Sequence, residues 1–181
     1  LSDALDALGL PPAVTGLRQA SAGKPVAGRA VTVKLIAGNA PPSDHPRHLC
    51  TAAVEAAGPD HVIVIEQRSG LDAAAWGGIL SRAAPARDIE ESDRVGYTVY
   101  ARTLTCRTAR GRIHESECQT PIDFGDTKVL PGDYIAIDRS GCVVIPAARI
   151  ADVLARAEQI RDKSDDMAAA VYAGMPVSKV M

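Results

Sequence analysis

Aromatic side chains are scarce in this sequence, whose 181 residues include one tryptophan, one phenylalanine and four tyrosines. The core must therefore be built from Ala, Val, Ile and Leu, whose small side chains allow close approach in layered α/β packing. Hydrophobic residues make up 46% of the chain, which is enough for a packed core. The length is that of one domain, since domains usually hold roughly 100–200 residues.

Long apolar runs and an excess of positive charge are also absent. No run reaches the ~18 apolar residues that a membrane span requires. The net charge is −2 and the pI about 6.1, so the chain lacks the basic footprint of a nucleic-acid-binding protein. The start at Leu1 lacks the basic and apolar regions of a signal peptide. We therefore expect a cytoplasmic protein with neither a membrane nor a nucleic acid as partner.

Paired cysteines are missing as well, since Cys50, Cys106, Cys118 and Cys142 form no CxxC motif. Reduced thiols in a cytoplasmic protein are the ordinary interpretation, with a zinc site or a disulfide as the alternative. The sequence also lacks the phosphate loop GxxxxGK[ST], the nucleophile elbow GxSxG and the zinc motif HExxH. The histidines of His45-x-x-His48 could both bind a metal, although a proline-rich loop is typical of exposed histidines.

The first half of the chain alternates helical and extended patterns. A short helix is predicted from Ser2, with Gly9 ending it. β-Branched alternation predicts a strand over 26–36, and an Ala-rich segment predicts a helix over 49–57. The continuous apolar run 61–66 predicts a strand covered on both faces, followed by a second Ala-rich helix over 73–84.

The second half has the pattern of a β meander. The predicted strands are 97–101, 112–118, 128–130, 134–138 and 142–145. A long helix is predicted over 147–173, where apolar residues recur at helical spacing until Gly174-Met175-Pro176 stops it. Residues 1–181 are thus predicted to form a single α/β domain.

Two short segments suggest chemistry. Gly77-Gly78 follows Trp76 at the start of a predicted helix, where exposed backbone N–H groups can bind an anion. A tight helix–sheet contact would explain the same glycines. In Arg87-Asp88, the guanidinium could hold a substrate oxygen and the carboxylate a hard cation. A solvated charge run at the start of a helix is the alternative.

Several segments together resemble one family. They are 2–5, 26–33, 76–80 (WGGIL), 86–89 (ARDI), 129–133 (VLPGD), 138–146 (DRSGCVVIP) and 174–181 (GMPVSKVM). Their order and spacing are similar to the family of the regulator of ribonuclease activity A and the 4-hydroxy-4-methyl-2-oxoglutarate (4-carboxy-4-hydroxy-2-oxoadipate) aldolases. The resemblance implies a layered α-β-β-α sandwich like the swivelling phosphohistidine-type domain, assembled as a homotrimer or hexamer.

The resemblance also implies a divalent-metal-dependent lyase of the class II type, using Mg²⁺ or Mn²⁺ on small 2-oxo acids. Aldolase members release pyruvate from 4-hydroxy-4-substituted 2-oxo acids, and many decarboxylate oxaloacetate. Carried over, Asp88 would hold the metal, partly through water, and Arg87 would contact the keto oxygen and the pyruvate enolate. The backbone of Gly77, Gly78, Ile79 and Leu80 would bind the pyruvyl carboxylate. A cation and a guanidinium at one oxygen stabilise the charge that develops there.

The sequence departs from the aldolases in two places. Gly78 stands where they carry an acidic residue, which shifts the expectation towards decarboxylation. The interval from Gly78 to Arg87 is about twelve residues shorter than in the family, so we expect the intact protein to hold further residues between Ala84 and Pro85. The alternatives are a non-catalytic protein-binding regulator, like the family's inhibitor of an RNA-degrading enzyme, and a binding domain whose site has decayed. Asp88 favours the enzyme, because the regulator has no need of a metal-binding carboxylate.

Overall fold

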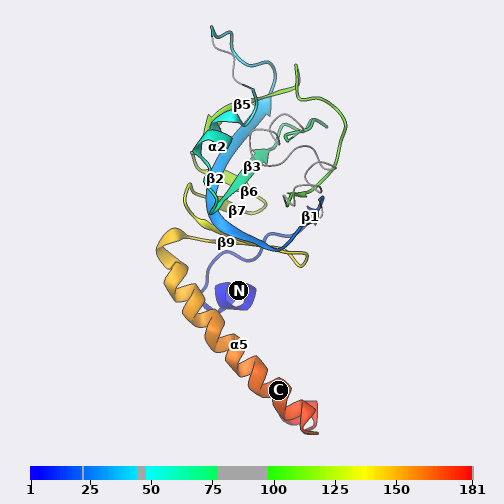
Figure 1. Ribbon diagram of the computed structural model, residues 1–181, viewed down its shortest axis with the longest axis vertical. Helices are drawn as coiled ribbons and strands as arrows, with labels where there is room; N and C mark the ends of the chain where they lie inside the picture. Colours follow the sequence, from blue (N-terminus) through cyan, green and yellow to red (C-terminus); the bar gives the residue numbers. More distant parts are fainter. Residues whose placement is uncertain (22, 45–47, 77–97, 181) are drawn as a thin grey trace.

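The computed structural model describes residues 1–21, 23–44, 48–76 and 98–180 (Figure 1). These residues form a mixed α/β body around a twisted sheet, as the sequence predicted. A long C-terminal helix extends from the body, and the N-terminal helix lies beside it. No helix in the described ranges is long and apolar enough to cross a bilayer.

The sheet is organised around one long strand, β2 (Val26–Ala37). β3 (His61–Gln67) pairs with it in parallel, and α2 (Thr51–Ala56) lies in the connection between them. β8 (Tyr134–Ile137) pairs antiparallel with the first part of β2, and β5 (Ile113–Cys118) pairs antiparallel with its last part. β9 (Cys142–Ile145) continues the sheet beyond β8. The predicted strands at 26–36, 61–66, 112–118, 134–138 and 142–145 are confirmed.

The two faces of β2 belong to different hydrophobic clusters. Val31, Val33 and Leu35 pack on the face that α2 covers. Ala30 packs on the other face, with the hairpin of β6 (Ile122–Phe124) and β7 (Thr127–Val129). The sequence predicted a strand at 128–130 but not its partner β6. The middle of β2 is thus buried on both faces, which fixes the register of the sheet.

The expected helix over 73–84 is wrong for its first residues, because 73–76 are not helical. The N–H of Ala74 donates to the carbonyl of Arg107 (2.8 Å), so the backbone bonds across the fold instead of along a helix. Residues 77–84 lie outside the described ranges. This is a case of tertiary contacts overriding the helix propensity of alanine.

The expected strand over 97–101 is shortened to β4 (Tyr100–Ala101), which pairs with the two residues of β1 (Arg18–Gln19). The N–H of Val99 donates to the hydroxyl of Ser21 (2.8 Å) instead of to a neighbouring strand. Tyr97 lies outside the described ranges.

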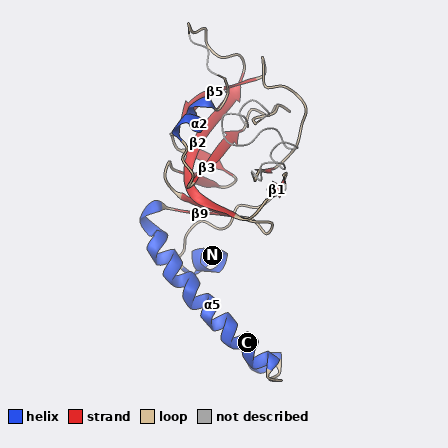
Figure 2. Ribbon diagram, viewed as in Figure 1, coloured by secondary structure: helices blue, strands red, loops and turns tan. Residues whose placement is uncertain are grey.

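The C-terminal helix is confirmed, with a 3₁₀ turn η1 (Ala147–Arg149) before α5 (Ile150–Tyr172) and a short α6 (Val177–Val180) after it. α5 packs through the buried Val153 on β9 and on α1 (Ser2–Ala7), and then continues away from the body (Figure 2). Buried Asp133 fixes its start, since Oδ1 accepts from the N–H of Ala147 and Oδ2 from that of Leu130 (both 2.9 Å). The predicted turn at 131–133 thus also anchors a helix.

Candidate functional site

The residues predicted to carry the chemistry lie outside the described ranges, which stop at Trp76 and resume at Thr98. They are the anion-binding segment Gly77, Gly78, Ile79 and Leu80, and the pair Arg87 and Asp88. The interval between Ala84 and Pro85 lies there too. The structure describes residues 73–76, which lead into this segment.

Residues 73–76 pack on the face of the sheet that α2 covers. Ala73 is buried in the cluster formed by β2, α2 and β5, and half-buried Trp76 packs against the same cluster. Cys50, immediately before α2, is fully buried there. The residue preceding Gly77 therefore packs against the hydrophobic core of the sheet.

A β-bulge in β5 shapes this face. Leu35 pairs with Glu115, whereas Lys34 pairs with Glu117, so Ser116 is the extra residue of the bulge. Its hydroxyl donates to the carbonyl of Lys34 (3.1 Å). Residues three apart point to opposite faces of a regular strand, but the bulge turns Glu115 to the same face as Cys118. A carboxylate is thereby brought to the face that carries the Ala73–Trp76 segment.

Glu115 and Cys50 connect this carboxylate to the segment. Oε2 of Glu115 accepts a hydrogen bond from the backbone N–H of Cys50 (2.6 Å). Cys50 has φ +61°, an uncommon conformation for a residue other than glycine. Its Sγ lies 3.6 Å from the carbonyl oxygen of Ala75 and donates to it. The contacts run from β5 through the start of α2 to the residue before Trp76.

The thiols on this face are held in the neutral form. Burial raises the pKa of Cys50, and the negative charge of Glu115 and the nearby Cys118 raise it further. Burial and Glu115 also raise the pKa of Cys118, against a smaller opposing effect of the Gln119 backbone. All four cysteines are free thiols. A nucleophile or a soft metal ligand requires the thiolate, so Cys50 and Cys118 are suited to packing.

The described histidines contact backbone atoms. Nδ1 of His114 lies 3.1 Å from the carbonyl oxygen of Gly38, and Nδ1 of His48 lies 3.2 Å from that of Leu49. His45, the other candidate of the His-x-x-His pair, is not among the described residues. Within the described ranges, no group of three His, Cys, Asp or Glu side chains could hold a metal ion.

The opposite face of the sheet carries a second polar cluster. Oε2 of buried Glu66 accepts from the N–H of Asp123 (2.8 Å). Arg68 forms ion pairs with Glu66 (4.0 Å) and Asp123 (3.6 Å), and it donates to the carbonyl of Gly125. These contacts fasten the β6–β7 hairpin to the end of β3. Sequence reasoning missed this cluster and left open whether Glu115 faces the site, because neither a bulge nor a hairpin contact leaves a motif.

A family model described as RraA-like, Aldolase/RraA, matches residues 1–144. The chain therefore belongs to the RraA-like family, and the resemblance predicted from the sequence is confirmed. This family holds both aldolases with decarboxylase activity and non-catalytic ribonuclease inhibitors. Residues of α5 and α6 follow the matched range.

Particular relatives are similar over most of this chain. Protein DlpA of Legionella pneumophila is 26% identical over 193 residues, which cover 96% of this chain and 30% of DlpA. The chain thus spans less than a third of that relative's length. A protein of Pseudomonas syringae pv. tomato has 25% identity and a TM-score of 0.83, covering 99% of this chain and 85% of its own. Streptomyces coelicolor RraAS2 is described as an unusual member of the RNase ES inhibitor RraA protein family. It has 21% identity and a TM-score of 0.70, covering 91% of this chain and 89% of its own.

Proposed function

We propose that the protein is a divalent-metal-dependent lyase that acts on small 2-oxo acids and releases pyruvate. The observation that carries this proposal is the pair Arg87-Asp88 after Trp76-Gly77-Gly78, in a chain that belongs to the RraA-like family. Aldolases of this kind need a carboxylate for a hard cation and a cation-bearing side chain at the keto oxygen. Both are supplied by adjacent residues.

In this proposal the backbone N–H groups of residues 77–80 bind the substrate carboxylate, because amides at a helix start attract anions. Arg87 donates to the keto oxygen and keeps its positive charge as electron density moves onto that oxygen. The Glu115–Cys50–Ala75 contacts support the loop from the side of Trp76. They act by positioning and touch no substrate.

Asp88 would hold Mg²⁺ or Mn²⁺. Such an ion, when bound, supplies a Lewis acid at the keto oxygen. The donor set fits a hard cation, because a carboxylate and water are its preferred ligands.

Gly78 favours oxaloacetate decarboxylation over aldol cleavage. A glycine side chain can neither orient water nor shuttle a proton, which aldol cleavage requires. Decarboxylation needs only binding of the 2-oxo acid and stabilisation of the enolate charge. We propose oxaloacetate as the first substrate to test, with a layered α-β-β-α subunit in a homotrimer or hexamer in the cytoplasm. The intact chain is proposed to hold about twelve more residues between Ala84 and Pro85, which an intact-mass measurement checks.

The decisive experiment follows pyruvate release from oxaloacetate and from 4-hydroxy-4-methyl-2-oxoglutarate, with Mg²⁺ or Mn²⁺ and a metal-only blank. Asp88→Ala should abolish the metal-dependent turnover, whereas Asp93→Asn, in the same charge run, should leave it intact. EDTA should remove the activity of the wild-type protein. Absence of pyruvate from both substrates and from a panel of 4-substituted 2-oxo acids, or full activity of Asp88→Ala, would contradict the lyase.

A protein-binding regulator is the second candidate. The structural similarity to Streptomyces RraAS2, which is described as belonging to a ribonuclease inhibitor family, favours it. RNA cleavage by purified RNase ES should then slow when the protein is added, and equally so with Asp88→Ala. Inhibition without any pyruvate release would select this function in place of the lyase.

A further inference from the structure

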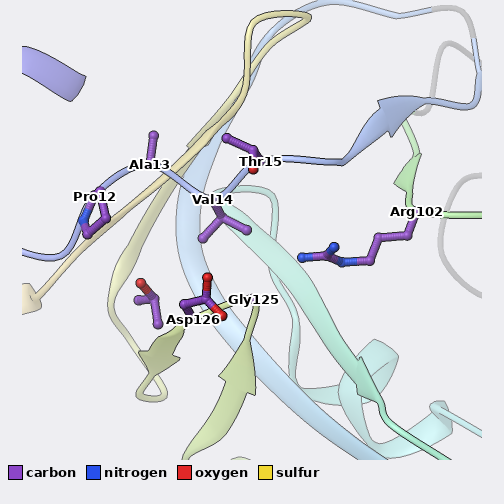
Figure 3. Close-up of a pocket in the computed structure, with 8 residues that line it drawn as sticks. Pro12, Ala13, Val14, Thr15, Arg102, Gly125 and Asp126 are labelled. Atoms are coloured by element: carbon purple, nitrogen blue, oxygen red, sulfur yellow. The ribbon is translucent and has the colours of Figure 1, made fainter. Parts of the chain in front are cut away.

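A small cavity lies apart from the Cys50–Trp76 region, between the N-terminal segment and the β6–β7 turn (Figure 3). Its volume is about 180 Å³. At roughly 30 Å³ per water molecule, it holds about six waters or an organic acid of similar size. Its walls come from residues 12–15, Arg102 and residues 125–127.

Two glycines make room for the guanidinium of Arg102. A Cβ built on Gly16 would lie 3.3 Å from Nη1 of Arg102, and one built on Gly125 would lie 3.3 Å from Nη2. Both glycines have positive φ, +80° and +64°. On both sides of the guanidinium the neighbouring residue therefore has no side chain. Arg102 follows the end of β4 and extends towards the cavity (Figure 3).

Arg102 is exposed, and within the described residues its guanidinium has neither a hydrogen bond nor an ion pair. Arg68 contrasts with it, since Arg68 reaches the same turn at the carbonyl of Gly125 and is paired with Asp123 and Glu66. Arginine presents five donors in a planar fork that matches a carboxylate in two places. Water solvates this exposed fork, and a carboxylate that enters the cavity can replace that water.

Backbone hydrogen bonds hold the N-terminal wall of the cavity, and Asp126 contributes one negative charge to the lining. The N–H and C=O of buried Val14 both bond to Cys142 (2.7 and 3.2 Å), which ties the N-terminal wall to β9. Thr15 and buried Thr127 add hydroxyl groups to the lining. Exposed Asp126, which also lines the cavity, opposes a second negative charge on any ligand.

We propose that this cavity binds a small organic monocarboxylate, held by Arg102 in a bidentate pair. The guanidinium of Arg102 carries one positive charge, so it matches a ligand with one negative charge. The negative charge of Asp126 disfavours a phosphate dianion. This site is independent of the proposed lyase chemistry, because it uses neither Arg87 nor Asp88 and requires no metal.

The test uses ¹⁵N-labelled protein titrated with acetate, pyruvate and inorganic phosphate, at constant ionic strength and with EDTA to exclude metal-dependent binding. Acetate and pyruvate should produce saturable shifts at the amides of Gly16, Gly125 and Thr127, and bind more tightly than phosphate. Arg102→Gln should weaken their binding about tenfold or more, since a bidentate charge-assisted pair is lost. Arg110→Gln, which removes the same charge from an exposed position outside the cavity lining, should bind as the wild type does.

Asp126→Asn should narrow the preference for acetate over phosphate without abolishing acetate binding. The proposal is overturned by an absence of saturable shifts, by shifts confined to other parts of the chain, or by equal weakening in Arg102→Gln and Arg110→Gln. Tighter binding of phosphate than of either carboxylate to the wild-type protein would likewise overturn it.

Discussion

Oε2 of Glu115 lies 2.6 Å from the backbone nitrogen of Cys50 and accepts its hydrogen bond. The two residues come from different elements, and the bond exists because a bulge turns Glu115 to the α2 side of the sheet. The negative charge also lies at the amino end of α2, where unpaired N–H groups favour it. One carboxylate thus orients both a short helix and the segment that leads to the proposed substrate loop.

Glu115→Ala should destabilise the protein by about 1–3 kcal/mol, because the N–H of fully buried Cys50 would lose its acceptor. Urea unfolding measures the free energy, and the fluorescence of Trp76, the single tryptophan, reports on the adjoining segment. Glu115→Gln keeps an acceptor and should cost less. Glu117→Ala is the matched control. Among the described residues the Glu117 side chain forms only an exposed ion pair, with Lys34, so its loss should cost less than about 0.5 kcal/mol. Equal costs for the two alanine variants would contradict the role of Glu115.

The cysteines should differ sharply in reactivity. Cys106 is exposed, whereas Cys50 and Cys142 are buried and Cys118 is half-buried with a raised pKa. Iodoacetamide at pH 8 should therefore label Cys106 first in the native protein, because the thiolate is the reactive form. Intact-mass spectrometry counts the labels, and unfolded protein should take four. Early labelling of Cys50 in the folded protein would contradict its burial.

Stability should fall at alkaline pH, and Cys142 should contribute to that fall. Burial raises the pKa of Cys142 from 9.0 to about 12. The unfolded thiol ionises at lower pH than the folded one, so its contribution is complete below pH 9 and is lost as the pH rises towards 12. The loss is at most about 1.4 kcal/mol per pH unit for one group. Cys142→Ala should flatten this pH dependence in unfolding experiments between pH 9 and 10.5, whereas Cys106→Ala should leave the slope unchanged.

Asp133→Ala should cost about 1–3 kcal/mol, because it removes the acceptors of two backbone N–H groups at a buried position. One of these groups is that of Ala147 at the start of η1, so the loss should also loosen the attachment of α5. Hydrogen exchange of the α5 amides near Val153 measures this effect. Asp166→Ala, on the exposed part of α5, should change neither quantity. Normal protection near Val153 in Asp133→Ala would show that the anchor lies elsewhere.

Gly125→Ala should destabilise the protein more than Gly9→Ala does. Both glycines have similar φ, +64° and +62°, so an alanine is strained at each by about 1–2 kcal/mol. A Cβ at Gly125 would also lie 2.9 Å from Cγ1 of Val14, whereas one at Gly9 meets nothing within 4 Å. The difference between the two free energies of unfolding therefore measures crowding alone. Equal values would mean that the N-terminal segment moves away from the turn without cost.

The sequence predicts the elements whose pattern is local. Cys142–Ile145 and the long helix from Ile150 emerge where expected, since an apolar run bounded by turns and a helical repeat need no knowledge of the rest of the chain. Ala73–Trp76 fails because its backbone bonds to Arg107 and Cys50, a relation between distant residues. The short strands β1 and β6 fail for the same reason.

The site is predictable only through the family. Arg87 and Asp88 indicate a site only through their order relative to Trp76 and the glycines. As an isolated pair they resemble any surface charge run. The role of Glu115 could not be predicted from the sequence at all. Its role depends on the extra residue Ser116, and nothing in Ile113–Cys118 distinguishes a bulged strand from a regular one.

The pairing of β2 with β8 has a consequence for synthesis of the chain. Gly28 is paired with Ile135, so one edge of β2 stays open until almost the whole sheet has left the ribosome. At ~5–20 residues per second, the wait lasts roughly 5–20 s. An open strand edge of this kind is a template for pairing with other chains. Newly made protein should therefore pass through an interval in which this edge of β2 is exposed.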